Sequence, residues 1–94
     1  MKILVMSENQ TIHFQQKLEK LGFVLDYKSY EHRTLNSAFE LNFETKTMIG
    51  VHVTLIKYKG IKAYTATVDQ VKELLILPTE DSREVYAETV LMRI

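Results

Sequence analysis

The residues best suited to chemistry in this chain form one short stretch, 57–62, with the sequence Lys-Tyr-Lys-Gly-Ile-Lys. Lysine ammonium groups bind phosphate oxygens, and a tyrosine ring can stack on a nucleic-acid base. The stretch therefore yields four candidate nucleic-acid-binding residues: Lys57, Tyr58, Lys59 and Lys62. The same composition is also typical of a solvated hairpin tip, where lysines protect an edge strand from unwanted pairing.

Tyrosines supply a second candidate surface. Five of them occur among the 94 residues, and each joins a large apolar ring to a polar tip, which suits an anchor at a protein interface. If the runs 48–58 and 61–68 are neighbouring strands, Ile56, Tyr58 and Tyr64 share one sheet face. We predict these three as protein-interface residues, in contact with a partner protein or with a second copy of the chain.

Residues for catalysis, metal binding or cofactor binding follow no recognisable pattern. The chain has no Cys, which excludes thiol nucleophiles, disulfides and zinc–thiolate sites. The three histidines, His13, His32 and His52, are not spaced as paired metal ligands. Neither a Gly-x-Ser-x-Gly motif nor a glycine-rich phosphate loop occurs. The sequence predicts a non-enzymatic protein without metal or cofactor; an enzyme whose site is assembled from scattered residues is the remaining alternative.

The elements that must position these residues are centred on residues 37–68. In the run 37–45, Phe39, Leu41 and Phe43 alternate with polar residues, which predicts a strand with one apolar face. The run 48–58 is rich in β-branched and aromatic residues, and it places Val51, Val53 and Leu55 on one face.

The links between these runs are short. Residues 45–47 join the first two, and Lys59-Gly60 interrupts the pattern before 61–68 resumes it. A glycine between two alternating runs favours a hairpin, because glycine reaches positive φ without a clash. We therefore predict a three-stranded antiparallel meander over 37–68, in which the two apolar trios of 37–45 and 48–58 line a common interior face.

Outside the meander, helix signals alternate with strand signals. Ser7 and Gln10 have capping-box spacing, and Gly22 is a good residue to end the helix that follows. Asp69 is a candidate N-cap, and Pro78 bars continuation of the next helix. The last segment, 82–94, fits both the helical and the strand period, and its β-branched and aromatic content favours a strand. The predicted elements are strands over 2–6 and 23–30, helices over 8–21 and 70–77, and a strand in preference to a helix over 82–94.

The chain as a whole is predicted to be one α+β domain, residues 1–94, with a mostly antiparallel sheet of five or six strands and two helices packed on it. Formal net charge is zero, but 46–72 carries five basic residues against one acidic residue, whereas 73–94 carries two against five. No apolar run approaches the ~20 residues of a membrane span, and the lack of Cys favours the cytoplasm. We expect a small binding protein that acts through protein contact, with nucleic-acid binding by the 57–62 hairpin as the alternative.

Overall fold

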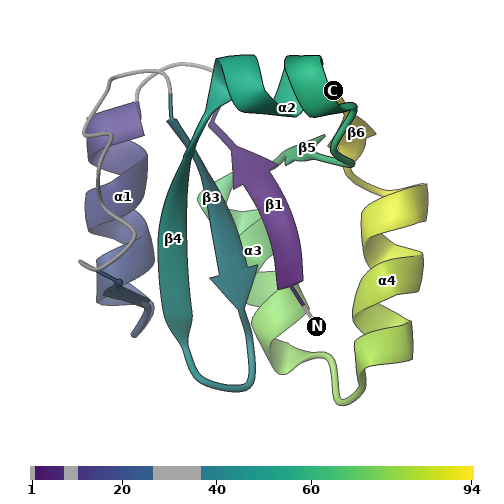
Figure 1. Ribbon diagram of the computed structural model, residues 1–94. Coiled ribbons are helices and arrows are strands. Elements are labelled where there is room, and N and C mark those ends of the chain that lie inside the picture. Colours follow the sequence, from purple (N-terminus) through teal and green to yellow (C-terminus); the bar gives the residue numbers. More distant parts are fainter. Residues whose placement is uncertain (1, 8–10, 27–36) are drawn as a thin grey trace.

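A computed structural model describes residues 2–7, 11–26 and 37–94. It contains a six-stranded open sheet with strand order β2-β4-β3-β1-β5-β6 (Figure 1). In chain order the elements are β1 (Lys2–Met6), α1 (Thr11–Lys20), β2 (Val24–Leu25), β3 (Ser37–Asn42), β4 (Thr47–His52), α2 (Val53–Lys59), β5 (Tyr64–Thr65), α3 (Val68–Ile76), α4 (Glu80–Thr89) and β6 (Met92–Arg93).

The predicted α+β class and the mostly antiparallel sheet are confirmed. The pairs β1–β3, β3–β4 and β5–β6 are antiparallel, whereas β1–β5 and β2–β4 are parallel. The described residues form four helices, rather than the two expected from the sequence.

The β3–β4 hairpin is confirmed, and a local side-chain contact closes its turn. The Asn42 side-chain oxygen accepts hydrogen bonds from the backbone N–H groups of Glu44 (3.0 Å) and Thr45 (3.1 Å). Lys46 takes a left-handed conformation, with φ of 57°. The side chains of Phe39, Leu41 and Phe43 are buried as their alternation predicts.

The register of this hairpin corrects the prediction that both apolar trios share one face. Leu41 lies opposite Met48, and Ala38 lies opposite Val51. Directly opposed residues share a face, so Val51 lies on the side of the sheet away from Leu41. The turn length fixes this register, and a shift by one residue exchanges the faces of a whole strand.

The predicted meander is wrong after its first hairpin: the run 48–58 is a strand only as far as His52, and the run 61–68 contains a strand only at β5. The chain leaves β4 at His52 and forms α2 from Val53, so two members of the second trio lie on a helix. Gly60 ends this helix: its φ is 62°, and the N–H of Ile61 donates to the carbonyl of Ile56 at 3.0 Å. This hydrogen bond is typical of a Schellman C-cap. The positive φ of Gly60 suits such a cap as well as it suits a hairpin turn. β5 then pairs with β1 in parallel instead of with β4.

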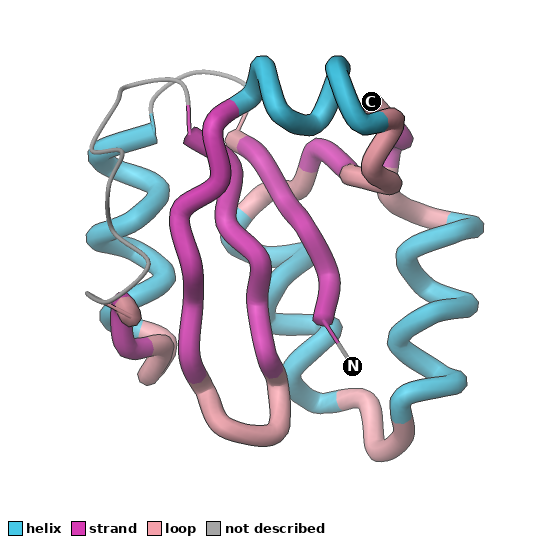
Figure 2. Tube along the Cα trace, in the orientation of Figure 1, coloured by secondary structure: helices cyan, strands magenta, loops and turns pink. Residues whose placement is uncertain are grey.

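Two apolar clusters, one on each side of the sheet, make up the core. The larger cluster lies under α1, α3 and α4; its most fully buried large side chains include Leu18, Phe23, Phe39, Leu41, Met48, Leu74, Val5 and Val71. The smaller cluster comprises Leu4, Ala38, Ile56 and Ala63, with Met6 and Val51 packed against it. Figure 2 shows α2 crossing one end of this second face.

In the second half of the chain, helices α3 and α4 each begin at a capping box. Thr67 and Gln70 form a capping box at the start of α3, two residues before the cap predicted at Asp69. Thr79 and Ser82 form another at the start of α4. The strand predicted over 82–94 is therefore wrong up to Thr89, and a strand is present only at β6.

In the first half, the helix predicted over 8–21 is present from Thr11, and Gly22 ends it with a φ of 102°. The N–H of Phe23 donates to the carbonyl of Leu18 at 3.2 Å, again as in a Schellman motif. The strand predicted over 23–30 is present as β2, and its remainder from 27 lies outside the described residues, as do Gln10 and His32.

Candidate protein-contact surface

The predicted nucleic-acid residues lie at the end of α2 and in the segment after it. Lys57, Tyr58 and Lys59 belong to the last turn of the helix, and all three are exposed. Successive helical residues are about 100° apart around the axis, so Lys57 and Lys59 point in divergent directions. The predicted hairpin would have placed both lysines around one tip. The structure therefore does not gather these lysines into one patch.

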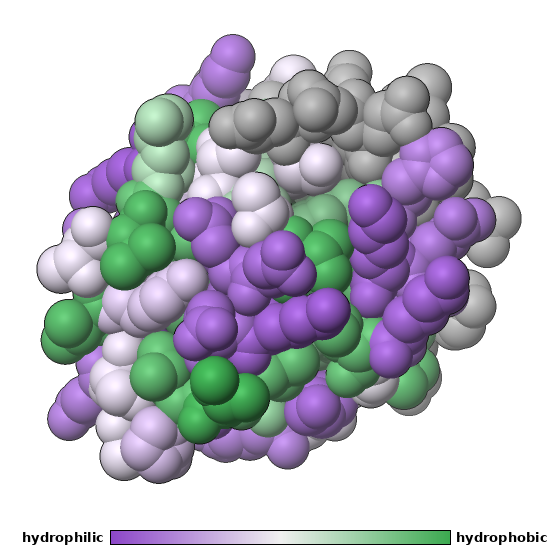
Figure 3. Space-filling view, turned by 180° about the vertical axis from the view of Figure 1, so that it is seen from behind, coloured by the Kyte–Doolittle hydropathy of each residue, from purple (hydrophilic) through white to green (hydrophobic). Residues whose placement is uncertain are grey.

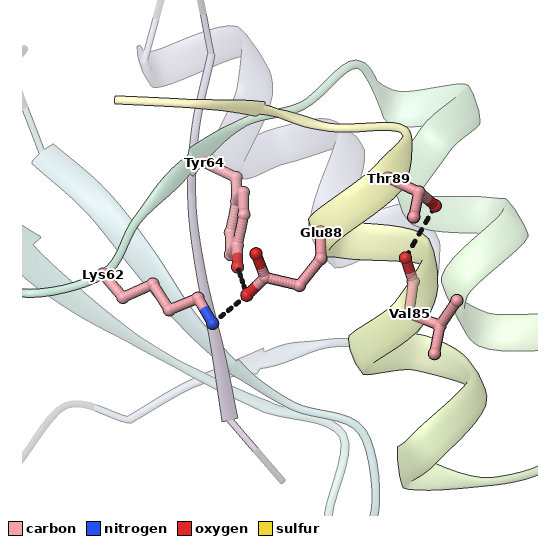
Figure 4. A network of polar contacts seen from close by, with 5 residues as sticks. All are labelled: Lys62, Tyr64, Val85, Glu88 and Thr89. Atoms are coloured by element: carbon pink, nitrogen blue, oxygen red, sulfur yellow. Dashed lines mark hydrogen bonds and ion pairs between the residues drawn. The ribbon is translucent and has the colours of Figure 1, made fainter.

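Lys62 lies in an ionic cluster with α4. Its ammonium group forms an ion pair with a carboxylate oxygen of Glu88, and the Tyr64 hydroxyl donates a 2.6 Å hydrogen bond to the same oxygen (Figure 4). A hydrogen bond to a charged acceptor is stronger than a neutral one. The cluster thus fastens α4 to β5, which gives Lys62 a structural role.

Two of the three predicted interface residues are part of the core. Ile56 is only 4% exposed, where α2 packs on the sheet, and Tyr64 is only 5% exposed. Neither presents an apolar surface to a partner while the fold is intact. The sequence placed them outside because it assigned 48–58 and 61–68 to adjacent strands, whereas α2 is a helix that buries one side and β5 lies in mid-sheet.

Tyr58, the third predicted residue, is 88% exposed. Three further apolar side chains are exposed near this end of the sheet: Ile61 (40%), Met92 (72%) and Ile94 (47%). The N–H of Ile94 donates to the carbonyl of Ala63 at 3.0 Å, which brings the end of the chain against the segment that leaves α2 (Figure 1). We name these four residues, Tyr58, Ile61, Met92 and Ile94, the α2–β6 surface.

β6 is also an edge of the sheet. It pairs with β5, where Thr65 lies opposite Met92 and Tyr64 lies opposite Arg93. In the part of the chain that the structure describes, no strand pairs with its other side. An edge strand leaves backbone N–H and C=O groups unpaired on its outer side, and the two-residue β6 leaves few of them. The sequence analysis missed Ile61, Met92 and Ile94; the alternation of Met92 and Ile94 was the available signal.

The face seen from behind differs from this surface. Figure 3 shows hydrophobic and hydrophilic residues interleaved across it. A groove of about 630 Å³ between α1 and α3 is lined by Lys17, Lys20, Leu21, Thr67, Val68, Asp69 and Lys72. The Nζ of Lys72 lies 3.8 Å from the Oδ1 of Asp69. The groove is lined by the C-terminal end of α1 and the N-terminal end of α3, whose helix-dipole charges have opposite signs. The charged residues of the lining are three lysines and one aspartate.

The described residues contain no candidate metal site and no helix suited to crossing a membrane. Across residues 2–7, 11–26 and 37–94, no three His, Asp or Glu side chains come together as ligands for a metal ion. Among the helices formed by those ranges, none combines the length and apolar character needed to cross a bilayer.

Comparison with known proteins adds no relative. No protein-family model, curated protein or solved structure matches this chain.

Proposed function

We propose that this protein is a small non-enzymatic binding protein and that the α2–β6 surface is where it contacts another protein. The observation that carries the proposal is that Tyr58, Ile61, Met92 and Ile94 are exposed on two segments joined by the Ile94–Ala63 hydrogen bond, beside an open sheet edge. Single exposed apolar residues are ordinary, but a contiguous group marks an interaction site in many soluble proteins. Tyr58 supports it further, because tyrosine is enriched among the residues that dominate binding energy.

Site-specific photo-crosslinking tests this proposal directly. Benzophenone side chains at positions 58 and 92 should each give a crosslinked protein adduct in cells that express the variants. The matched control is position 76, where Ile76 is 73% exposed at the far end of α3. Adducts at 58 and 92 but not at 76 support the proposal. Equal adducts at all three positions, or none, would overturn it.

Sedimentation of the purified protein at several concentrations distinguishes self-association from contact with a different protein. A second copy of the chain produces a mass that rises with concentration, whereas a different partner leaves the isolated protein monomeric. Crosslinked adducts at twice the chain mass should appear only in the first case.

Nucleic-acid binding is the second candidate, because Tyr58 and its sequence neighbours Lys57 and Lys59 are all exposed at the end of α2. Such binding must weaken steeply with salt as phosphate counterions are released. The double variant Lys57→Glu with Lys59→Glu should abolish it, whereas Lys17→Glu with Lys20→Glu on α1 should leave it unchanged. If a panel of labelled oligonucleotides shows no binding to the native protein at low salt, this candidate is excluded.

A further inference from the structure

We infer that the groove between α1 and α3 binds a small organic molecule that carries a chain of phosphate groups. The groove lies on the other side of the sheet from α2, on the face seen in Figure 3. It is therefore separate from the α2–β6 surface, and the inference goes beyond the proposed function. The volume of about 630 Å³ lies within the range of roughly 300–1,000 Å³ that is usual for small-molecule pockets.

Lysines supply positive charge from both walls of this groove. Lys17 and Lys20 belong to α1, and Lys72 belongs to α3. Among the described lining residues, Asp69 is the one acid, so the formal charge of the lining is three minus one, or +2. The two helix ends contribute partial charges of opposite sign, which largely cancel. The side chains therefore set the sign of the potential, and the groove attracts an anion.

The other acidic residues of these two helices are directed away from the groove. Glu19 lies about 200° around the α1 axis from Lys17, and its carboxylate accepts a 3.0 Å hydrogen bond from Gln15. Burial and the nearby carboxylate of Glu73 both raise the pKa of Tyr86 on α4. Glu73 therefore lies toward α4, and α3 separates α4 from α1 (Figure 1). Neither carboxylate cancels the positive charge between α1 and α3.

The kinds of residue in the lining favour a phosphate chain with an organic portion. Lysine binds phosphate as a point charge, whereas a planar carboxylate is better matched by the fork of an arginine, which the described lining lacks. Because the lysines come from both walls, a ligand with several charged groups can contact more of them than a single ion can. Leu21 and Val68 are half-buried in the lining and offer apolar contact to the rest of the ligand.

Asp69 opposes an anion in this groove only weakly. The 3.8 Å distance from its Oδ1 to the Nζ of Lys72 is long for an ion pair, and both side chains are exposed, by 92% and 58%. Exposed pairs of this kind contribute little to stability. A phosphate group can therefore displace the carboxylate from Lys72. Loss of the carboxylate should strengthen binding, because it removes a like charge from the site.

Calorimetric titration of the intact protein tests the inference. The probes are ATP, adenosine and inorganic triphosphate, at low salt and with EDTA, so that no metal ion neutralises the phosphates. ATP should bind at least about tenfold more tightly than adenosine, and added salt should weaken its binding by screening. Inorganic triphosphate should displace ATP. An oligonucleotide without a terminal phosphate should not displace it; displacement would assign the groove to nucleic acid and overturn the inference.

Charge reversal in the groove should weaken ATP binding. Lys72→Glu, and separately Lys17→Glu with Lys20→Glu, should each reduce the affinity about tenfold or more, because each replaces attraction by repulsion. Lys57→Glu with Lys59→Glu on α2 is the matched control and should leave ATP binding unchanged. A loss in the control as large as that in the groove variants would overturn the inference.

Asp69→Asn completes the experiment, because it should improve binding, and a poorly folded variant cannot do so. ATP should bind about threefold more tightly to it than to the native protein. Equal binding of ATP and adenosine, no binding of ATP at millimolar concentration, or unchanged affinity in Asp69→Asn would each overturn the inference. These results are independent of the crosslinks at 58 and 92, so the proposed function stands or fails separately.

Discussion

The two faces of the sheet are covered very differently. One face lies under three helices and carries large side chains, such as Phe39 and Leu41. Among the described residues, the other is covered at one end by the seven-residue helix α2, which buries Ile56 against the sheet. Buried apolar area is the dominant stabilising contribution to folding. We infer that the thickly covered face stabilises the domain, while the thinly covered face presents the α2–β6 surface.

The largest expected effect is on the thickly covered face. Phe39→Ala removes a buried ring that packs near Phe14, with ring centroids 6.3 Å apart. Loss of a buried phenylalanine costs about 4 kcal/mol of unfolding free energy, part of it from the cavity left behind. Urea denaturation should show this loss. A cost below about 1 kcal/mol would contradict the assignment of stability to this face.

The second prediction concerns the smaller cluster. Ile56→Ala should cost about 3 kcal/mol or less, because the side chain is buried but belongs to a cluster of few residues. Amide hydrogen exchange should accelerate in α2 more than in α1 or α3, since Ile56 packs α2 against the sheet. Uniform acceleration across all helices would mean that the two faces form one cooperative unit.

The third prediction concerns the attachment of α4 to β5. Tyr64→Phe removes the hydroxyl that donates to Glu88 while keeping the buried ring. The expected cost is about 1.5 kcal/mol, the usual range for a hydrogen bond to a charged group. Tyr58→Phe is the matched control and should leave the unfolding free energy unchanged, because that ring is exposed.

The smallest effect on stability should come from the α2–β6 surface itself. Met92→Ser changes a side chain that is 72% exposed, so the unfolding free energy should shift by less than about 0.5 kcal/mol. Crosslinking of a partner protein from position 58 should nevertheless fall several-fold, because the variant loses apolar contact area. A large stability loss without a loss of binding would reverse the roles assigned to the two faces.

Local patterns in the sequence determined a good part of this protein. The alternation around Phe39, Leu41 and Phe43 defined β3 and its buried face, because a strand reverses its side chains at every residue. Gly22 marked the end of α1, since only a residue tolerant of positive φ closes a Schellman motif easily. The predicted α+β class follows from such local periods.

Gly60 shows why the rest required the tertiary structure. A positive φ suits both a hairpin turn and a helix C-cap, so this glycine predicted a chain reversal without identifying the element before it. Residues 53–59 are β-branched and aromatic enough for a strand, and their helical form is the one that brings Ile56 onto Leu4, Ala38 and Ala63. Tertiary contacts, the burial of Ile56 among them, override strand propensity here.

The candidate surface depended on that same choice. With 53–59 helical, Ile56 and Tyr64 are buried, whereas Tyr58 is left outside. β6 reaches its place only because α4 carries the chain back to β5. The sequence by itself determined the kinds of residue available for contact and the local periods of most elements. The tertiary structure decided which of them face solvent together, because strand order and hairpin register depend on contacts between residues far apart in the chain.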